Sequence, residues 1–236
     1  HTGAKEWIRE TSFCGVESAG GVPYDSEVYY IVFSNTSFTV NTSGNTITGI
    51  KQGANLSGSI EIPSIICGVP ITAIDSSAFA NQTGITSITL PNTITSIGAN
   101  AFENCTNLTS ISEFNNIVSI GAQAFKGCSS LTNISIPAGT TSIGAGAFAG
   151  CSNLNISVSS SNPNYSASGN ILYNKTGTVI NFACNISNTI TIQSTITEIL
   201  SYAFYDNDNL ETLHIYGAPT IGLSAFENCA NLTDVY

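Results

Sequence analysis

The sequence is poor in charged residues, and most of those present are negative. Only 8% of its 236 residues are charged, and five scattered basic residues stand against 15 acidic ones, for a formal net charge of −10. A surface that follows phosphate groups needs clustered lysine and arginine, so we exclude nucleic acid and anionic membranes as partners. No apolar run approaches the roughly 18 residues of a membrane-spanning helix. We therefore expect no membrane insertion in this segment.

Residues that carry catalysis or bind metal ions are also scarce. His1 and His214 are the two histidines of the chain, which excludes a multi-histidine metal site. His214 lies between two inward positions of an expected strand and should face solvent, where a histidine rarely catalyses. The Asp206-x-Asp208 pair lacks the turn glycine and the remaining ligand spacing of a calcium loop. Because no phosphate-binding glycine loop or Cys-x-x-Cys pair occurs either, we expect neither an enzyme nor a cofactor.

Methionine is absent altogether, and the chain begins at His1, which we interpret as the start of a trimmed or mature chain. Hydrophobic residues still make up 42% of the sequence, enough for a continuous core. Serine, threonine and asparagine take over the role of charge in keeping the surface soluble. This composition is typical of secreted and surface proteins, and we expect an extracellular or cell-surface location. Asn-x-Ser/Thr sequons such as Asn133 and Asn185 are expected by chance at this composition, so they do not establish glycosylation.

What the sequence does have is a 23-residue repeat. The dipeptide Ala-Phe recurs at this interval and then returns after an interruption, with its phenylalanines at Phe79, Phe102, Phe125, Phe148, Phe204 and, 22 residues later, Phe226. A fixed period of 20–30 residues predicts a solenoid, in which each coil buries its apolar face only by stacking on its neighbours. Solenoids offer long binding surfaces and rarely build the closed pocket of an enzyme.

Each repeat carries a short alternating segment, such as Leu131-x-x-Ile134-x-Ile136-Pro137, that predicts a strand ended by proline. Gly98, Gly121 and Gly144 follow a second apolar pair and should allow a tight corner. The Ala-Phe segment is expected to form one turn of helix with the phenylalanine pointing inward.

The seven cysteines do not have the placement of a disulfide framework. Cys105, Cys128 and Cys151 are 23 residues apart, and Cys229 has the same place relative to its phenylalanine. Glutamine or asparagine stands there in other repeats, which predicts a buried column of reduced thiols bonded to turn backbone. We expect Cys184 to be unpaired. No spacing argument supports a disulfide between Cys14 and Cys67, and both alternatives stay open there.

The repeated pattern Ile-Gly-x-x-Ala-Phe-x-x-Cys-x-x-Leu-x-x-Ile-x-Ile-Pro closely resembles the BspA-like leucine-rich repeats of bacterial and protist surface proteins. The resemblance covers about Ser59 to the end of the chain, and it includes a longer hairpin-bearing repeat at about 152–198. It implies an α/β leucine-rich-repeat solenoid: a β-rich horseshoe with one parallel strand per coil, joined by short turns or one-turn helices. Two positions depart from the pattern. Glu113-Phe114 replaces an apolar residue and proline, and Thr140 replaces isoleucine.

Residues 1–50 do not repeat, and residues 51–236 form the predicted array. Segments 28–33, 37–40 and 45–48 read as strands of an N-terminal β cap, which a solenoid needs at its end. A separate ligand-binding domain in 1–50 is the alternative.

The strands present two outward columns of small polar side chains, which could bind a glycan or an extended peptide or could only keep the sheet soluble. Aromatic residues, which favour binding hot spots, lie instead in the cap and in the longer repeat. The candidate binding surface comprises Thr89, Ser112, Ser135, His214, Tyr29, Tyr30, Tyr165 and Tyr173.

The resemblance implies a secreted or cell-surface binding module that adheres to host matrix proteins or to other cells. Its partner would be an extracellular protein or glycan on a host or neighbouring cell. The alternative is a structural spacer or self-assembling surface element without a specific ligand. The sequence does not indicate an oligomeric state.

Overall fold

The computed structural model describes residues 38–41, 43–50, 56–66 and 68–236. They belong to one compact unit, Phe33–Tyr236. The strand predicted at 28–33 and the alternatives for Cys14 and Cys67 lie outside the described residues. The boundary at residue 50 stays a prediction.

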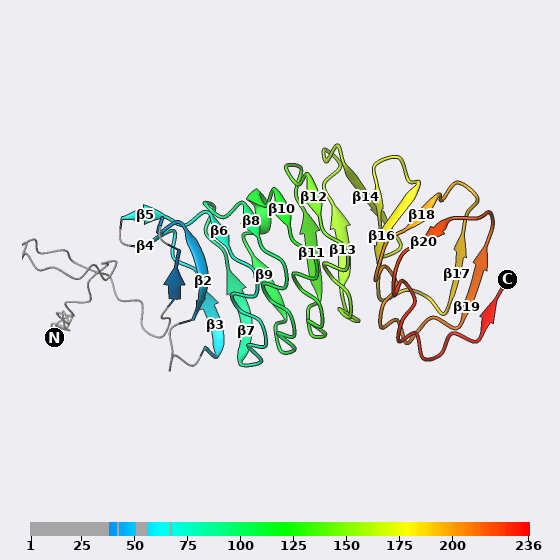
Figure 1. The fold of residues 1–236 in the computed structure, drawn as a ribbon, viewed down its shortest axis with the longest axis horizontal. Helices are drawn as coiled ribbons and strands as arrows, with labels where there is room; N and C mark the ends of the chain where they lie inside the picture. The colour runs from blue at the N-terminus through cyan, green and yellow to red at the C-terminus, as the bar shows by residue number, and fades with distance from the viewer. Residues whose placement is uncertain (1–37, 42, 51–55, 67) are drawn as a thin grey trace, which may run out of the picture. The chain divides into compact units, whose positions relative to one another are not determined.

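The fold is a β-solenoid whose coils follow one another in sequence order (Figure 1). One strand from each of these coils belongs to what we call the strand face: β3 (Gly58–Glu61), β7 (Ile85–Thr89), β9 (Ser110–Ser112), β11 (Asn133–Ile136), β13 (Asn155–Val158), β17 (Thr189–Ile192), β19 (Thr212–Ile215) and β21 (Asp234–Val235). They pair in parallel within three sheets, ordered β3-β7-β9, β11-β13 and β17-β19-β21. The predicted parallel strand per coil is confirmed.

A second set of strands, each two residues long, forms another face of the coils: β6 (Ala73–Ile74), β8 (Ser96–Ile97), β10 (Ser119–Ile120), β12 (Ser142–Ile143), β18 (Glu198–Ile199) and β20 (Thr220–Ile221). β1 (Phe38–Val40) and β2 (Thr46–Ile50) pair antiparallel, and β2 continues in parallel into β6. These are the second and third predicted cap strands, and the pairing gives the first coil a neighbour. β4 (Ile65–Ile66) and β5 (Val69–Pro70) form a small separate hairpin.

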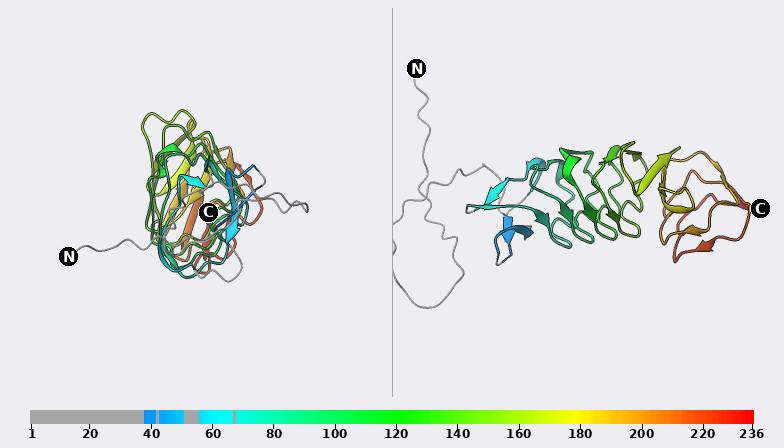
Figure 2. Two further views of the ribbon diagram at one scale, coloured as in Figure 1. Left: turned by 90° about the vertical axis from the view of Figure 1, so that its left-hand side faces the viewer. Right: turned by 90° about the horizontal axis from the view of Figure 1, so that it is seen from above.

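The longer repeat at about 152–198 contains the hairpin that its sequence predicts. β14 (Tyr165–Ser168), β15 (Ile171–Asn174) and β16 (Val179–Ala183) run antiparallel, and β16 then pairs in parallel with β18. The inserted strands therefore join the sheet of the short strands β18 and β20, while β13 and β17 belong to the two sheets of longer strands on either side. Figure 2 shows the coils from two further sides.

Four of the inward phenylalanines form a stack through the first part of the core, and Phe204 and Phe226 form a second stacked pair. Phe79, Phe102, Phe125 and Phe148 are fully buried, with successive ring centroids 5.1, 5.2 and 5.5 Å apart and planes within 8° of parallel. Phe182 follows Phe148 across the inserted hairpin at 5.6 Å. Since each buried aromatic side chain contributes roughly 1.5–3 kcal/mol, this stack is a main source of the coils' stability.

The Ala-Phe segments are hydrogen-bonded turns, so the predicted helical turn is wrong in this detail. Backbone bonds such as Phe102 N–H to the Ala124 carbonyl, 2.7 Å, run between coils and take the place of helical bonds. The one helix in the described residues is η1, a 3₁₀ turn at Phe114–Asn116.

Close approach of neighbouring coils, not a tight corner, explains the recurring glycines. A Cβ atom on Gly121 would lie 2.4 Å from the Ala99 nitrogen, and one on Gly144 would lie 2.3 Å from the Ala122 nitrogen. Neither glycine has a positive φ. A side chain would therefore push the coils apart.

The cysteine column is confirmed as packing of free thiols. Cys105, Cys128 and Cys151 are buried, and each Sγ donates to a carbonyl of the preceding coil at 3.1 Å. Asn207 takes the same role with an amide, donating to the Ala183 carbonyl at 2.7 Å. Cys184 is also free and buried, and its thiol donates to the Leu154 carbonyl, so it continues the column through the longer repeat.

Candidate functional site

Four of the predicted surface residues lie on the strand face. Ser112 is exposed and Thr89 half-buried, and the Ser112 hydroxyl donates to the Thr89 hydroxyl at 3.1 Å. Ser135 is exposed and lies opposite Ser157 in the next coil. His214 is half-buried, and its ring stacks on that of Tyr236 with centroids 5.0 Å apart. The outward columns predicted from the alternation are therefore present.

The aromatic candidates contribute less to an open surface. Tyr165 is buried, and its hydroxyl accepts the Ile143 backbone N–H at 2.9 Å, so its ring holds β14 on the neighbouring coil. Burial raises the pKa of Tyr165 and of the half-buried Tyr173. The structure thus removes Tyr165 from the exposed candidates. Tyr29 and Tyr30 lie outside the described residues.

The strand face is interrupted between β9 and β11. The ladder of β3, β7 and β9 ends at β9, and the next ladder begins with β11, so these two strands are not paired with each other. One residue before β9 and β11 begin, the two coils are still joined by a hydrogen bond from the Thr132 N–H to the Thr109 carbonyl at 3.2 Å. This hydrogen bond fixes the first end of the interruption.

The departure at Glu113-Phe114 explains this interruption. These residues stand where Leu90-Pro91 and Ile136-Pro137 stand in neighbouring repeats. Glu113 has left-handed backbone angles, φ 58° and ψ 34°, which turn its side chain outward and bring Phe114 inward. The Phe114 ring is 6% exposed and packs against Phe125 at 6.3 Å. The apolar position is thus filled one residue later, and the carboxylate stays in solvent.

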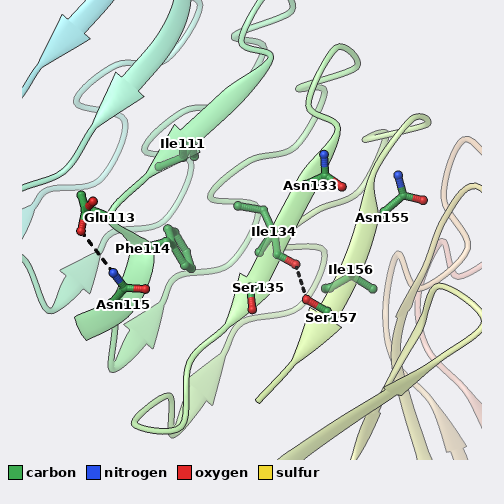
Figure 3. Close-up of a pocket in the computed structure, with 10 residues that line it drawn as sticks. All are labelled: Ile111, Glu113, Phe114, Asn115, Asn133, Ile134, Ser135, Asn155, Ile156 and Ser157. Carbon is green, nitrogen blue, oxygen red and sulfur yellow. Dashed lines mark hydrogen bonds between the residues drawn. The ribbon is translucent and has the colours of Figure 1, made fainter. Parts of the chain in front are cut away.

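A shallow groove of about 380 Å³ opens on the strand face at this interruption (Figure 3). We call it the groove and define it by its lining residues: Ile111, Glu113, Phe114, Asn115, Asn133, Ile134, Ser135, Asn155, Ile156 and Ser157. β9 and η1 form one side, and β11 and β13 form the other. Its volume is within the range of ligand pockets, about 300–1,000 Å³.

The groove has an apolar base, a polar rim and one formal charge. Ile134 and Ile156 are buried, while the side chains of Asn133, Asn155 and Ser135 are exposed. Asn115 donates an amide hydrogen bond to the Glu113 carboxylate at 3.2 Å. Among the described residues, no lysine, arginine or histidine lines the groove. This arrangement can hold a ligand by hydrogen bonds and by attraction to a positive charge.

Part of this site is not predicted by the sequence. Glu113 and Phe114 stand out only as departures from the repeat, and Asn133 and Asn155 only as members of a column. The signal that could identify the groove is the loss of the apolar-proline pair in one repeat of an otherwise regular array. Thr189 and Thr191, which extend the outward columns on β17, could be found from the alternation around Ile190 and Ile192.

Within the described ranges no group of three histidine, cysteine or acidic side chains is placed to hold a metal ion. Over the same residues, no helix has the length and apolar character that crossing a membrane requires.

Comparison with known proteins identifies the class of repeat. The model of the "BspA type Leucine rich repeat region" matches residues 26–155 and 173–236, in six copies. The chain therefore belongs to the BspA-type leucine-rich repeat family, whose repeats are typically non-enzymatic binding modules. A search of curated proteins gave no match.

The fold is that of a solved bacterial leucine-rich-repeat protein. The T. pallidum leucine-rich-repeat protein is 22% identical, with a TM-score of 0.52 over 85% of this chain and 78% of the other. Two further solved structures are similar at lower scores. A leucine-rich cell surface protein from Faecalibacterium prausnitzii is 24% identical, with a TM-score of 0.37 over 89% and 76%. The pneumococcal vaccine antigen PcpA is 19% identical, with a TM-score of 0.49 over 86% and 68%.

Proposed function

We propose that this chain is a secreted or cell-surface binding module that adheres to extracellular proteins through its strand face. The family, the low charge and the serine-, threonine- and asparagine-rich surface support this assignment. Binding would rest on extended surface contact and would need no bond chemistry or cofactor. Host matrix proteins or proteins of neighbouring cells are the proposed partners.

The groove is the observation that carries the proposal. Outside it, the outward columns are small and polar and offer few of the aromatic or arginine residues that dominate binding energy. The groove adds a concave surface, an apolar base and a charge to that plain sheet. A partner would therefore be centred near β9 and β11.

The test is a binding titration of the soluble chain on immobilised collagen, laminin and fibronectin. Saturable binding to one of them supports the proposal. Ser135→Arg places a long cation in the groove and should weaken that binding about tenfold, the effect of losing one well-buried contact. Ser152→Arg adds the same charge at an exposed turn outside the strand face and should leave binding unchanged. Absence of saturable binding to all three proteins would count against adhesion to matrix and favour a spacer role.

A further inference from the structure

We propose that the groove accepts an extended peptide segment of another protein, bound by strand pairing and by a lysine or arginine side chain placed at Glu113. This inference deepens the proposed function by naming the chemical class of the partner. It rests on the unpaired strands, the fixed geometry around them and the charge of the groove.

The two strands that border the groove each have a free edge. β9 pairs with β7 on one side only, and β11 pairs with β13 on one side only. In a parallel ladder, the backbone N–H and C=O groups of a strand bond to both neighbours, so an unpaired edge leaves donors and acceptors available. Here two such edges face the same groove. An added strand is the ligand whose own backbone matches them.

The interruption is built into the fold. At one end the Thr132–Thr109 hydrogen bond holds the coils together. At the other, the buried ring of Phe114 sits against Phe125 and fixes η1 in place. Beyond η1 the two coils are joined again, because the Thr140 hydroxyl donates to the Ile117 carbonyl at 2.6 Å. A preformed site avoids the free-energy cost of rearrangement on binding.

The chemistry of the groove indicates a basic peptide. Glu113 is exposed, and Asn115 is the one side chain found donating to it in the described part of the chain. The described residues that line the groove include no cation to neutralise this carboxylate, and the whole chain has a net charge of −10. The carboxylate therefore attracts a lysine or arginine from the partner. At the start of β11, exposed Asn133 donates its amide to the Thr132 hydroxyl at 3.1 Å, and its Oδ1 can accept a peptide N–H.

A glycan fits the groove less well than a peptide. Phe114 is the aromatic residue of the lining, and at 6% exposure it presents no open ring face for a sugar to stack on. The free backbone edges, in contrast, are specific for a ligand with regular backbone donors and acceptors. Half-buried Ile111 also gives the inward side chains of an alternating strand an apolar contact.

The test measures the binding of designed peptides to the full chain by fluorescence anisotropy. The probe is an acetylated, amidated peptide of about six residues, the usual strand length, in which valine alternates with lysine. One matched control replaces each lysine by glutamate. A second control carries N-methyl groups on alternate backbone nitrogens, which keeps the side chains but removes the donors that pair with a strand edge. A neutral cello-oligosaccharide represents the glycan class.

We expect saturable binding of the lysine peptide. Each matched control should bind about tenfold more weakly, the glutamate peptide because it loses charge attraction and the N-methylated peptide because it loses a few hydrogen bonds. Glu113→Gln should weaken the lysine peptide about two- to fivefold, the range of a solvent-exposed ion pair, and Ser152→Arg should not. Equal binding of the N-methylated peptide overturns the strand pairing. Binding of the oligosaccharide without the peptide overturns the peptide class.

The same variants separate this inference from the proposed function. If the parent chain binds a matrix protein and Glu113→Gln and Ser135→Arg bind it equally well, adhesion stands and the groove is not the site. If the lysine peptide binds but no matrix protein does, the groove is a peptide site and matrix adhesion fails. If neither binds, both are wrong.

Discussion

Restoring the regular repeat at the interruption should make the protein more stable. The double substitution Glu113→Leu with Phe114→Pro gives this repeat the apolar-proline pair of Leu90-Pro91. Relief of the left-handed backbone at Glu113 gains about 1–2 kcal/mol, and proline in a compatible position gains about 0.4–1 kcal/mol. Exchange of the Phe114 ring for leucine and loss of its contact with Phe125 cost about 1 kcal/mol. Renewed pairing of β9 with β11 adds about 1 kcal/mol.

The net gain is about 2 kcal/mol, which for a chain of this size corresponds to a rise in Tm of roughly 4–8 °C. Calorimetry of the parent and the double variant measures it. Glu113→Gly is the matched control, because it relieves the backbone angles and leaves Phe114 in place, and it should gain about 1 kcal/mol. A double variant that melts at or below the parent temperature would refute the claim that Glu113-Phe114 causes the interruption at a cost in stability.

Three further substitutions or conditions test the packing of the coils. Gly121→Ala should lower the free energy of unfolding by about 2–3 kcal/mol, because its Cβ would meet the backbone of the neighbouring coil. The matched control Gly139→Ala has open space around its Cβ and should change that free energy by less than about 0.5 kcal/mol. Denaturant titrations measure both. Thr140→Val removes a buried hydroxyl that donates to the Ile117 carbonyl at 2.6 Å and should cost about 1–3 kcal/mol, while the exposed Thr141→Val should cost little. Burial raises the pKa of Cys105 from its ordinary 9.0 to about 11, so its contribution to stability is full below pH 9 and is lost as pH rises toward 11, by up to about 1.4 kcal/mol per pH unit. Burial also raises the pKa of Cys128, Cys151 and Cys184, so their thiols add to this fall. Urea titrations across the range should show the combined fall, and Cys105→Ala should reduce its slope by up to about 1.4 kcal/mol per pH unit; an unchanged slope would mean that the Cys105 thiol does not titrate differently in the folded state.

The fold can be predicted from the sequence because the same side chains recur at the same position of each repeat. The spacing of Phe79, Phe102 and Phe125 predicts their stack, and the alternation around Ile134 predicts the strand and its outward residues. The recurrence of cysteine predicts the thiol column, whose hydrogen bonds the structure confirms. Each of these predictions depends only on which coil positions face inward, which the period determines.

The rest depends on distances between coils that a pattern does not contain. The role of Gly121 is set by how closely the backbone of the preceding coil approaches, and Cys184 enters the column only because the inserted hairpin brings it there. The groove could not be predicted for a similar reason. A carboxylate at an apolar position can be buried or turned outward, and the left-handed angles of Glu113 decide between these outcomes.

The interruption at Glu113-Phe114 lowers the stability of the fold and leaves a binding surface in its place. One measurement tests this: the affinities of the parent and of the Glu113→Leu, Phe114→Pro variant for the same sensor surface. That surface carries either the lysine peptide or the matrix protein that the parent binds. We predict that the variant is folded and more stable, and that it binds about tenfold more weakly or worse, because the paired edges no longer accept a strand. Equal affinity of the two chains for the same surface would contradict the claim.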